Sequence, residues 1–123
     1  MILVDTSVWV DHLSSGNSAL ERLLDRGGVL GHPFVISELA LGNLRQRDLV
    51  LDALRQLPRA AIATDEEVFR FIAAWRLFGR GIGYVDAHLL AAARLSADAR
   101  LWTRDRRLRA VAAQLDLAAA LPA

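Results

Sequence analysis

Four of the fourteen acidic residues occupy positions that a purely structural carboxylate rarely takes. Asp5 and Asp105 follow apolar runs that are typical of buried strands. Glu38 and Asp86 lie on the apolar stripes of expected helices, where a lone buried carboxylate is costly. If the fold brings the four carboxylates together, they repel one another and raise each other's pKa unless a cation neutralises them.

An all-carboxylate pocket favours a hard divalent cation, Mg²⁺ or Mn²⁺, over Zn²⁺. Magnesium held in this way keeps several waters and suits hydrolysis of a phosphodiester bond. The four acids are far apart in the chain, so the site depends on the fold and not on a local motif. Each acid also has a structural explanation: Asp5 and Asp105 as helix caps, Glu38 reaching to water, and Asp86 in a first helical turn.

The strands that must position these acids are short and apolar. Ile2–Val4 is apolar throughout, which indicates a strand buried on both faces and therefore a parallel sheet covered by helices. Further strands are expected at 29–30, 100–103 and, weakly, 60–62, with a last short strand from Leu117. The alternation of strands and helices favours an α/β fold. In open parallel sheets, ligands bind at the carboxyl ends of the strands.

Helix boundaries are marked by capping signals. Ser18 to Glu21 and Thr64 to Glu67 both have the pattern of a capping box. The first of these helices should stop at Gly27-Gly28, and the second near Gly79. Other helices are expected at 33–42, 47–57, 84–95 and 105–115.

Composition excludes several classes of protein. The 123 residues are expected to form a single domain over 1–123, and the 54% hydrophobic content argues against disorder. The absence of cysteine excludes disulfide scaffolds, thiolate zinc sites and thiol nucleophiles. All fifteen basic residues are arginine, which excludes mechanisms that need a catalytic lysine. The net charge of +1 requires any polyanion to meet a local basic patch.

The chain begins without a basic, apolar signal-peptide pattern, and no uncharged run approaches the ~20 residues of a membrane-spanning helix. We therefore expect a cytoplasmic protein.

Four segments in order resemble VapC-type toxins, PIN-domain ribonucleases of bacterial toxin–antitoxin systems. The segments are Ile2-Leu3-Val4-Asp5-Thr6-Ser7, Ile36-Ser37-Glu38-Leu39, Asp86-Ala87-His88-Leu89-Leu90-Ala91 and Trp102-Thr103-Arg104-Asp105-Arg106-Arg107-Leu108. The resemblance implies that the four acids are the catalytic and metal-binding residues, and it matches Thr6 and Thr103 to the hydroxyl residues beside them. Some members carry a further acid after the fourth, whereas Arg106 and Arg107 stand there in this chain.

The resemblance also implies a PIN-like three-layer α/β/α sandwich and Mg²⁺-dependent cleavage of cellular RNA, with tRNA or rRNA favoured and Mn²⁺ able to substitute. We expect Thr6, Ser7 and Thr103 to orient the metal ligands, and Arg104, Arg106 and Arg107 to contact RNA. Implied partners are a VapB-type antitoxin that reaches into the acidic pocket, a second copy of the chain in a homodimer, and operator DNA bound only through the antitoxin.

Two other classes of protein share parts of this pattern. Phosphotransfer domains also place acids at strand ends, but they rely on a lysine, and this chain has none. A catalytically silent PIN-like module would bind RNA or protein and use the acids only as structure. Metal binding without cleavage of any RNA would favour that module.

Overall fold

Three short parallel strands form the sheet in the computed structural model, which describes residues 1–122. The strands are β1 (Ile2–Val4), β2 (Val29–Leu30) and β3 (Arg100–Trp102), in the order β2-β1-β3. The first residue of β1 pairs with the first residue of each neighbour. The carboxyl ends of the strands therefore reach the same edge of the sheet.

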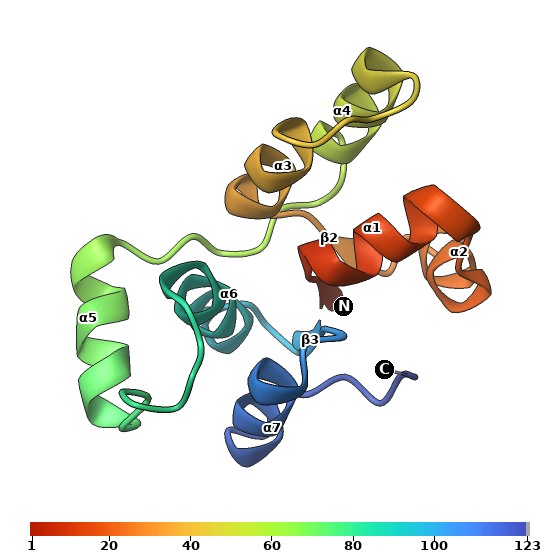
Figure 1. Ribbon diagram of the computed structural model, residues 1–123. Coiled ribbons are helices and arrows are strands. Elements are labelled where there is room, and N and C mark those ends of the chain that lie inside the picture. Colours follow the sequence, from red (N-terminus) through yellow and green to blue (C-terminus); the bar gives the residue numbers. More distant parts are fainter. Residues whose placement is uncertain (123) are drawn as a thin grey trace.

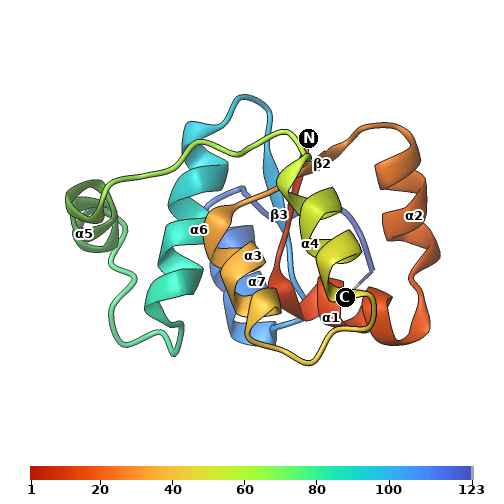
Figure 2. The same ribbon diagram turned by 90° about the horizontal axis from the view of Figure 1, so that it is seen from above.

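Helices cover both faces of this sheet. Their bounds are α1 (Thr6–Ser15), α2 (Ser18–Asp25), α3 (Pro33–Ala40), α4 (Arg47–Arg55), α5 (Asp65–Ala74), α6 (Tyr84–Leu95) and α7 (Arg106–Gln114). Figure 1 shows α1 and α2 on one side of the strands and α6 on the other, with α5 outside α6. From above, α5 again lies at the outer edge beside α6 (Figure 2). The three-layer α/β/α prediction is confirmed. Among residues 1–122, no helix is long and apolar enough to cross a membrane.

The core explains why β1 is apolar at every position. Leu3 and Val4 are completely buried, and so are Leu89 and Leu90 of α6. Leu101 of β3 is almost as well covered. Because both faces of the central strand meet helices, no position on it favours a polar side chain.

The weak strand expected at 60–62 is wrong. The chain makes a single parallel bridge there, between Arg59 and Gly31. The backbone N–H of Ala61 instead donates to the hydroxyl of Ser96, 2.8 Å away, so the segment leaves the sheet after one pair. The last strand expected from Leu117 is likewise reduced to a bridge, with Leu101 opposite residue 118.

Two helix ends also differ from expectation. Asn17, and not Ser18, caps α2, because its side-chain oxygen accepts from the Leu20 N–H at 3.0 Å. The capping box at Thr64 is confirmed, but α5 ends at Ala74 instead of near Gly79. Two residues after that end, Arg76 has a φ of 52°, which a helix cannot continue through.

Candidate active site

Asp5 follows β1 directly and is buried, with 7% of its surface exposed. It occupies the N-cap position of α1, but its side chain makes no capping hydrogen bond. Its Oδ2 atom accepts instead from the hydroxyls of Ser7 and Thr103, each at 2.7 Å. The helix-cap explanation therefore does not account for this carboxylate, which is held in place by two neighbouring hydroxyls.

Asp105 reaches the same edge because β3 pairs with β1. The hydroxyl of Thr103, which is itself buried, accepts from the backbone N–H of Asp105 at 3.0 Å. Asp105 is the N-cap of α7, and its Oδ1 atom accepts from the Leu108 N–H at 2.9 Å. The cap role expected of Asp105 is thus real, and it uses one of the two carboxylate oxygens.

Glu38 comes from α3, which packs against α1. Its apolar neighbours Val35 and Leu39 are buried, but Glu38 itself is exposed. The hydroxyl of Thr6 donates to Glu38 Oε1 at 2.7 Å and links the carboxylate to the first turn of α1. The side chain therefore leaves the apolar stripe of α3 and reaches the residue next to Asp5.

Asp86 lies in the first turn of α6, where its Oδ2 atom accepts from the Gly83 N–H at 2.9 Å. Burial raises the pKa of Asp86 above its ordinary value, although the hydrogen bond from Gly83 lowers it. Three nearby negative charges, those of Asp5, Asp105 and Glu38, raise the same pKa. The fold therefore brings Asp5, Asp105 and Glu38, which are far from Asp86 in the chain, within electrostatic reach of it.

The four carboxylates share one feature of hydrogen bonding. Each has one oxygen engaged by the protein, namely Asp5 Oδ2, Glu38 Oε1, Asp86 Oδ2 and Asp105 Oδ1. Among residues 1–122, the second oxygen of each accepts no hydrogen bond. Each acid is therefore oriented through one oxygen, and its other oxygen is free of hydrogen bonds in this part of the chain.

This donor set fits Mg²⁺ as an open site. Within the described 122 residues, no three histidine or acidic side chains are grouped so that they could hold a metal ion in a cage. Magnesium does not need such a cage, because it commonly binds one or two carboxylates and keeps waters for the remaining positions. Four oriented carboxylates with one oxygen each to offer match that requirement, and their mutual repulsion would be relieved by the ion.

The arginines beside Asp105 differ in their surroundings. The guanidinium of Arg104 lies 2.6 Å from Asp11 Oδ1 in an ion pair. The Arg107 side chain lies over the backbone of Gly81, where an added Cβ would come within 2.8 Å of Arg107 Cδ. Arg106 and Arg107 are exposed, and neither forms an ion pair in the part of the chain that the structure describes. Both guanidinium groups belong to residues that follow Asp105 directly in the first turn of α7.

The histidines have structural positions. His32 is fully buried and caps α3, with its Nδ1 atom accepting from the Phe34 N–H at 3.1 Å. Its pKa is lowered to about 4 by burial and by the charges of His88 and Arg59. His88 is also buried and packs against Phe34 and Tyr84. Neither ring hydrogen-bonds to any of the four acids.

Two contributors to the site were not foreseen from the sequence. One is the backbone N–H of Gly83, which holds Asp86, and the other is Asp11, which pairs with Arg104. Gly83 at the N-cap with an acid three residues later has the acidic half of a capping box, and this spacing is a signal in the sequence. Nothing in the local sequence marks Asp11, because its partner is distant in the chain.

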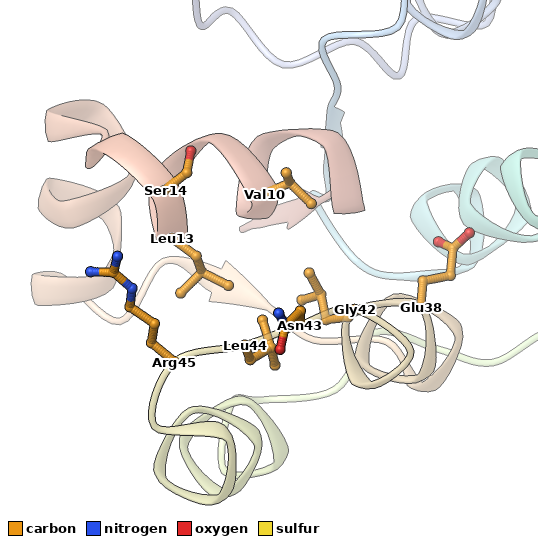
Figure 3. A pocket seen from close by; sticks show the side chains of 9 residues that line it. Val10, Leu13, Ser14, Glu38, Gly42, Asn43, Leu44 and Arg45 are labelled. Carbon is orange, nitrogen blue, oxygen red and sulfur yellow. The ribbon is translucent and has the colours of Figure 1, made fainter.

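A pocket of about 430 Å³ includes one of the four acids, Glu38, in its lining (Figure 3). It lies between α1 and the segment that follows α3. The residues that line it are Val10, Leu13, Ser14, Glu38, Leu39, Gly42, Asn43, Leu44 and Arg45. Glu38 therefore borders both the acidic site and this mainly apolar groove.

Comparison with known proteins agrees with this geometry. The PIN domain family matches residues 2–114. This chain belongs to the PIN-domain family. Within it, the VapC resemblance is confirmed: the chain is 50% identical over 120 residues to Ribonuclease VapC32 of Mycobacterium tuberculosis strain CDC 1551 / Oshkosh, which covers 98% of this chain and 97% of that protein. The same values hold for Ribonuclease VapC32 of strain ATCC 25618 / H37Rv. No solved structure is significantly similar.

Proposed function

We propose that this PIN-domain protein is the endoribonuclease toxin of a toxin–antitoxin pair and uses Mg²⁺ bound by Asp5, Glu38, Asp86 and Asp105. The observation that carries the proposal is the group of four carboxylates, each with one oxygen oriented by the protein and one oxygen available. The half-identical relatives that carry the name Ribonuclease VapC32 support it.

A bound Mg²⁺ ion and the protein would contribute different parts of the cleavage chemistry. A bound Mg²⁺ would polarise a phosphoryl oxygen and lower the pKa of a water for attack on the phosphodiester. Ser7 and Thr103 hold Asp5, and Thr6 holds Glu38, so the ligands are oriented before the ion arrives. In the proposed reaction, water attacks the phosphorus in place of the 2′-hydroxyl, the bond from phosphorus to the 3′-oxygen breaks, and the 3′-oxygen takes up a proton, so the expected products carry a 5′-phosphate and a 3′-hydroxyl.

The substrate we propose is a structured cellular RNA, with tRNA or rRNA favoured. Arg106 and Arg107 would contact its backbone, because they are exposed next to Asp105 and form no ion pair among residues 1–122. Arginine presents a planar fork of donors that binds phosphate oxygens in pairs. Replacement of either arginine by glutamine should weaken RNA binding and make it less dependent on salt.

The partners we propose are a VapB-type antitoxin and a second copy of the chain. The apolar groove bordered by Val10, Leu39 and Glu38 suits an antitoxin segment that also reaches the acids (Figure 3). The outer surface around α5 suits a homodimer, because Phe69 is 75% exposed and Phe78 65% exposed. Operator DNA would be bound only through the antitoxin.

The deciding experiment incubates antitoxin-free protein with total RNA in the presence of Mg²⁺, Mn²⁺ or EDTA. Asp5→Asn and Asp86→Asn variants are run beside the wild-type protein. We expect discrete fragments with 5′-phosphate ends that require a divalent cation and disappear in both variants. End-mapping of the fragments then identifies the RNA.

Retained cleavage in either variant would contradict the proposed site. Intact RNA under all conditions, from a protein that binds Mn²⁺, would point to a catalytically silent RNA- or protein-binding module.

A further inference from the structure

Arg104 is attached to α1 by both its backbone and its side chain. Its backbone N–H donates to the hydroxyl of Ser7 at 3.0 Å. Its guanidinium Nη1 lies 2.6 Å from Asp11 Oδ1. Ser7 and Asp11 are four residues apart in one helix, so they lie on the same face of α1 in successive turns. The loop between β3 and α7 is thus fastened to α1 at two points.

The residues on either side of Arg104 belong to the acidic site. Thr103 donates to Asp5, and Ser7 donates to the same Asp5 oxygen. Asp105 is connected to this network through its own N–H, which donates to the Thr103 hydroxyl. A shift of this loop along α1 would therefore move Asp105 relative to Asp5.

We propose that the Asp11–Arg104 ion pair is a positioning device that holds Thr103 and Asp105 in register with Asp5. The inference rests on the proposed function, since it concerns the metal ligands of that site. It assigns Arg104 to the alignment of the site instead of to RNA, and it gives a role to Asp11, an acid outside the group of four.

The charge and exposure of the pair favour this positioning role over a role in global stability and over a direct contact with RNA phosphate. A partly exposed ion pair contributes little to global stability, and the side chains of Arg104 and Asp11 are 46% and 30% exposed. A guanidinium already paired at 2.6 Å is a poorer phosphate contact than the unpaired Arg106 or Arg107, because the Asp11 pair must first be broken. The pair fixes the position of Asp105, so loss of the pair should displace Asp105.

The test uses Arg104→Gln, Asp11→Asn and the double variant. Arg26→Gln and Asp25→Asn are matched controls, because both residues are exposed at the end of α2 and neither forms an ion pair in residues 1–122. Calorimetry measures Mn²⁺ affinity without RNA, steady-state kinetics separates kcat from KM, and RNA binding is followed in EDTA against salt concentration.

We expect each single variant to lower Mn²⁺ affinity and kcat by about 10-fold, as is typical when groups that orient metal ligands are lost. The double variant should lose no more than either single variant, because both remove the same interaction. In the test variants, KM and the salt dependence of RNA binding should stay unchanged. Both control variants should match the wild type in every measurement. Arg104→Lys and Asp11→Glu, which keep the charges, should recover part of the loss.

Unchanged Mn²⁺ affinity in both single variants would overturn the proposal. It would also be overturned if Arg104→Gln weakens RNA binding and flattens its salt dependence while Asp11→Asn does not, since Arg104 would then be a phosphate contact. If the glutamine variant fails to fold, the lysine and glutamate variants carry the same test. The Mn²⁺ measurement does not need RNA cleavage, so failure of the proposed nuclease activity is distinguished from failure of this inference.

Discussion

At the scale of single residues, the four acids experience different environments. Asp5 is buried and Asp86 is half-buried, whereas Glu38 and Asp105 are exposed. Two hydroxyl donors compensate the negative charge of Asp5. Asp86 has a single backbone donor and three acidic neighbours. The pKa of Asp86 is raised, mainly by burial and further by these neighbours. Without a cation, the charge of Asp86 therefore works against folding, as is common for groups kept for function.

The Asp86→Asn variant tests this cost. Asparagine keeps an oxygen for the Gly83 N–H and removes the charge, so the metal-free variant should be more stable than wild type at pH 7, by a few degrees in Tm. The folded pKa lies above the unfolded value of 3.8, so the gain should vanish below about pH 3.8 and grow as pH rises through the folded pKa.

Calorimetry with and without Mg²⁺ provides the measurement for this variant. Added Mg²⁺ should stabilise wild type more than the variant. A variant less stable than metal-free wild type at pH 7 would contradict the interpretation. Asp98→Asn, a change at an exposed loop position, is the control and should leave the response to Mg²⁺ unaltered.

At the scale of elements, helix N-termini explain why repelling charges are tolerated. Asp5 and Asp105 are the N-caps of α1 and α7, and Asp86 lies in the first turn of α6. The positive end of a helix dipole favours a carboxylate at each of these places. Glu38 is the exception, because it lies near the C-terminus of α3, and there the Thr6 hydroxyl supplies the compensating donor.

The start of α3 should make stability depend on pH. His32 is buried with a pKa of about 4, below its unfolded value of 6.5, so the unfolded chain binds a proton more readily. Its stabilising effect is complete above pH 6.5 and is lost as pH falls to about 4. The loss is at most on the order of 3 kcal/mol. His32→Asn keeps a capping acceptor for Phe34 but does not titrate.

Urea unfolding between pH 7 and pH 4 measures the effect of His32. As pH falls from 7 to 4, the unfolding free energy of the wild type should decrease more than that of His32→Asn. His12→Asn, a change at a less buried histidine, is the control. Parallel pH profiles for wild type and His32→Asn would refute the assignment.

The loop before α6 should affect RNA binding through one glycine. Gly79 and Gly81 have φ values of 69° and 79°, so alanine at either costs about 1 kcal/mol of strain. Alanine at 79 meets no atom within 4 Å, whereas at 81 it collides with the Arg107 side chain. Because that side chain is flexible, Gly81→Ala should displace Arg107 without unfolding the protein.

Comparison of the two alanine variants isolates this contact. Both should lower stability by similar amounts, but only Gly81→Ala should weaken RNA binding, to the level of Arg107→Gln. Fluorescence anisotropy with a labelled RNA in EDTA gives the affinities. Equal RNA affinity of the two alanine variants would show that the contact with Gly81 does not matter for binding.

At the scale of the whole molecule, exposed apolar side chains gather in two separate regions. One surrounds α5 and includes Phe69 and Phe78, and the other borders the groove beside α1 and includes Val10. Figures 1 and 2 both show α5 far from α1, on the other side of the sheet. The surface proposed for a second copy and the surface proposed for an antitoxin therefore lie apart from each other.

A glutamate placed in either surface should disrupt one of the two proposed interfaces and leave the other intact. Phe69→Glu should convert a dimer into a monomer without loss of antitoxin binding, because burying an unpaired carboxylate in an apolar interface is costly. Val10→Glu should weaken antitoxin binding at least 10-fold and leave the dimer intact. Light scattering and calorimetry measure the two effects. Loss of both properties in either variant would show that the two surfaces are not independent.

Much of the architecture was predictable from local patterns. The apolar run of β1 indicated a doubly covered parallel strand, and the helix at 84–95 was predicted with its observed bounds. The strand at 60–62 was not correctly predicted, because a short apolar run does not reveal that Ser96 will take the N–H of Ala61. Local propensity describes a segment, whereas its hydrogen-bond partners depend on the rest of the fold.

The candidate residues were identifiable from the amino-acid sequence alone. Side-chain type, apolar periodicity and resemblance singled out Asp5, Glu38, Asp86 and Asp105, since burial of a charge is unfavourable enough to be noticed in a pattern. Their arrangement depends on the packing of the folded chain. It joined Thr6 to Glu38, Thr103 to Asp5 and Arg104 to Asp11, and it left one oxygen of each carboxylate available. These contacts join residues far apart in the chain, and strand register and helix packing, which no short segment encodes, determine which atoms meet.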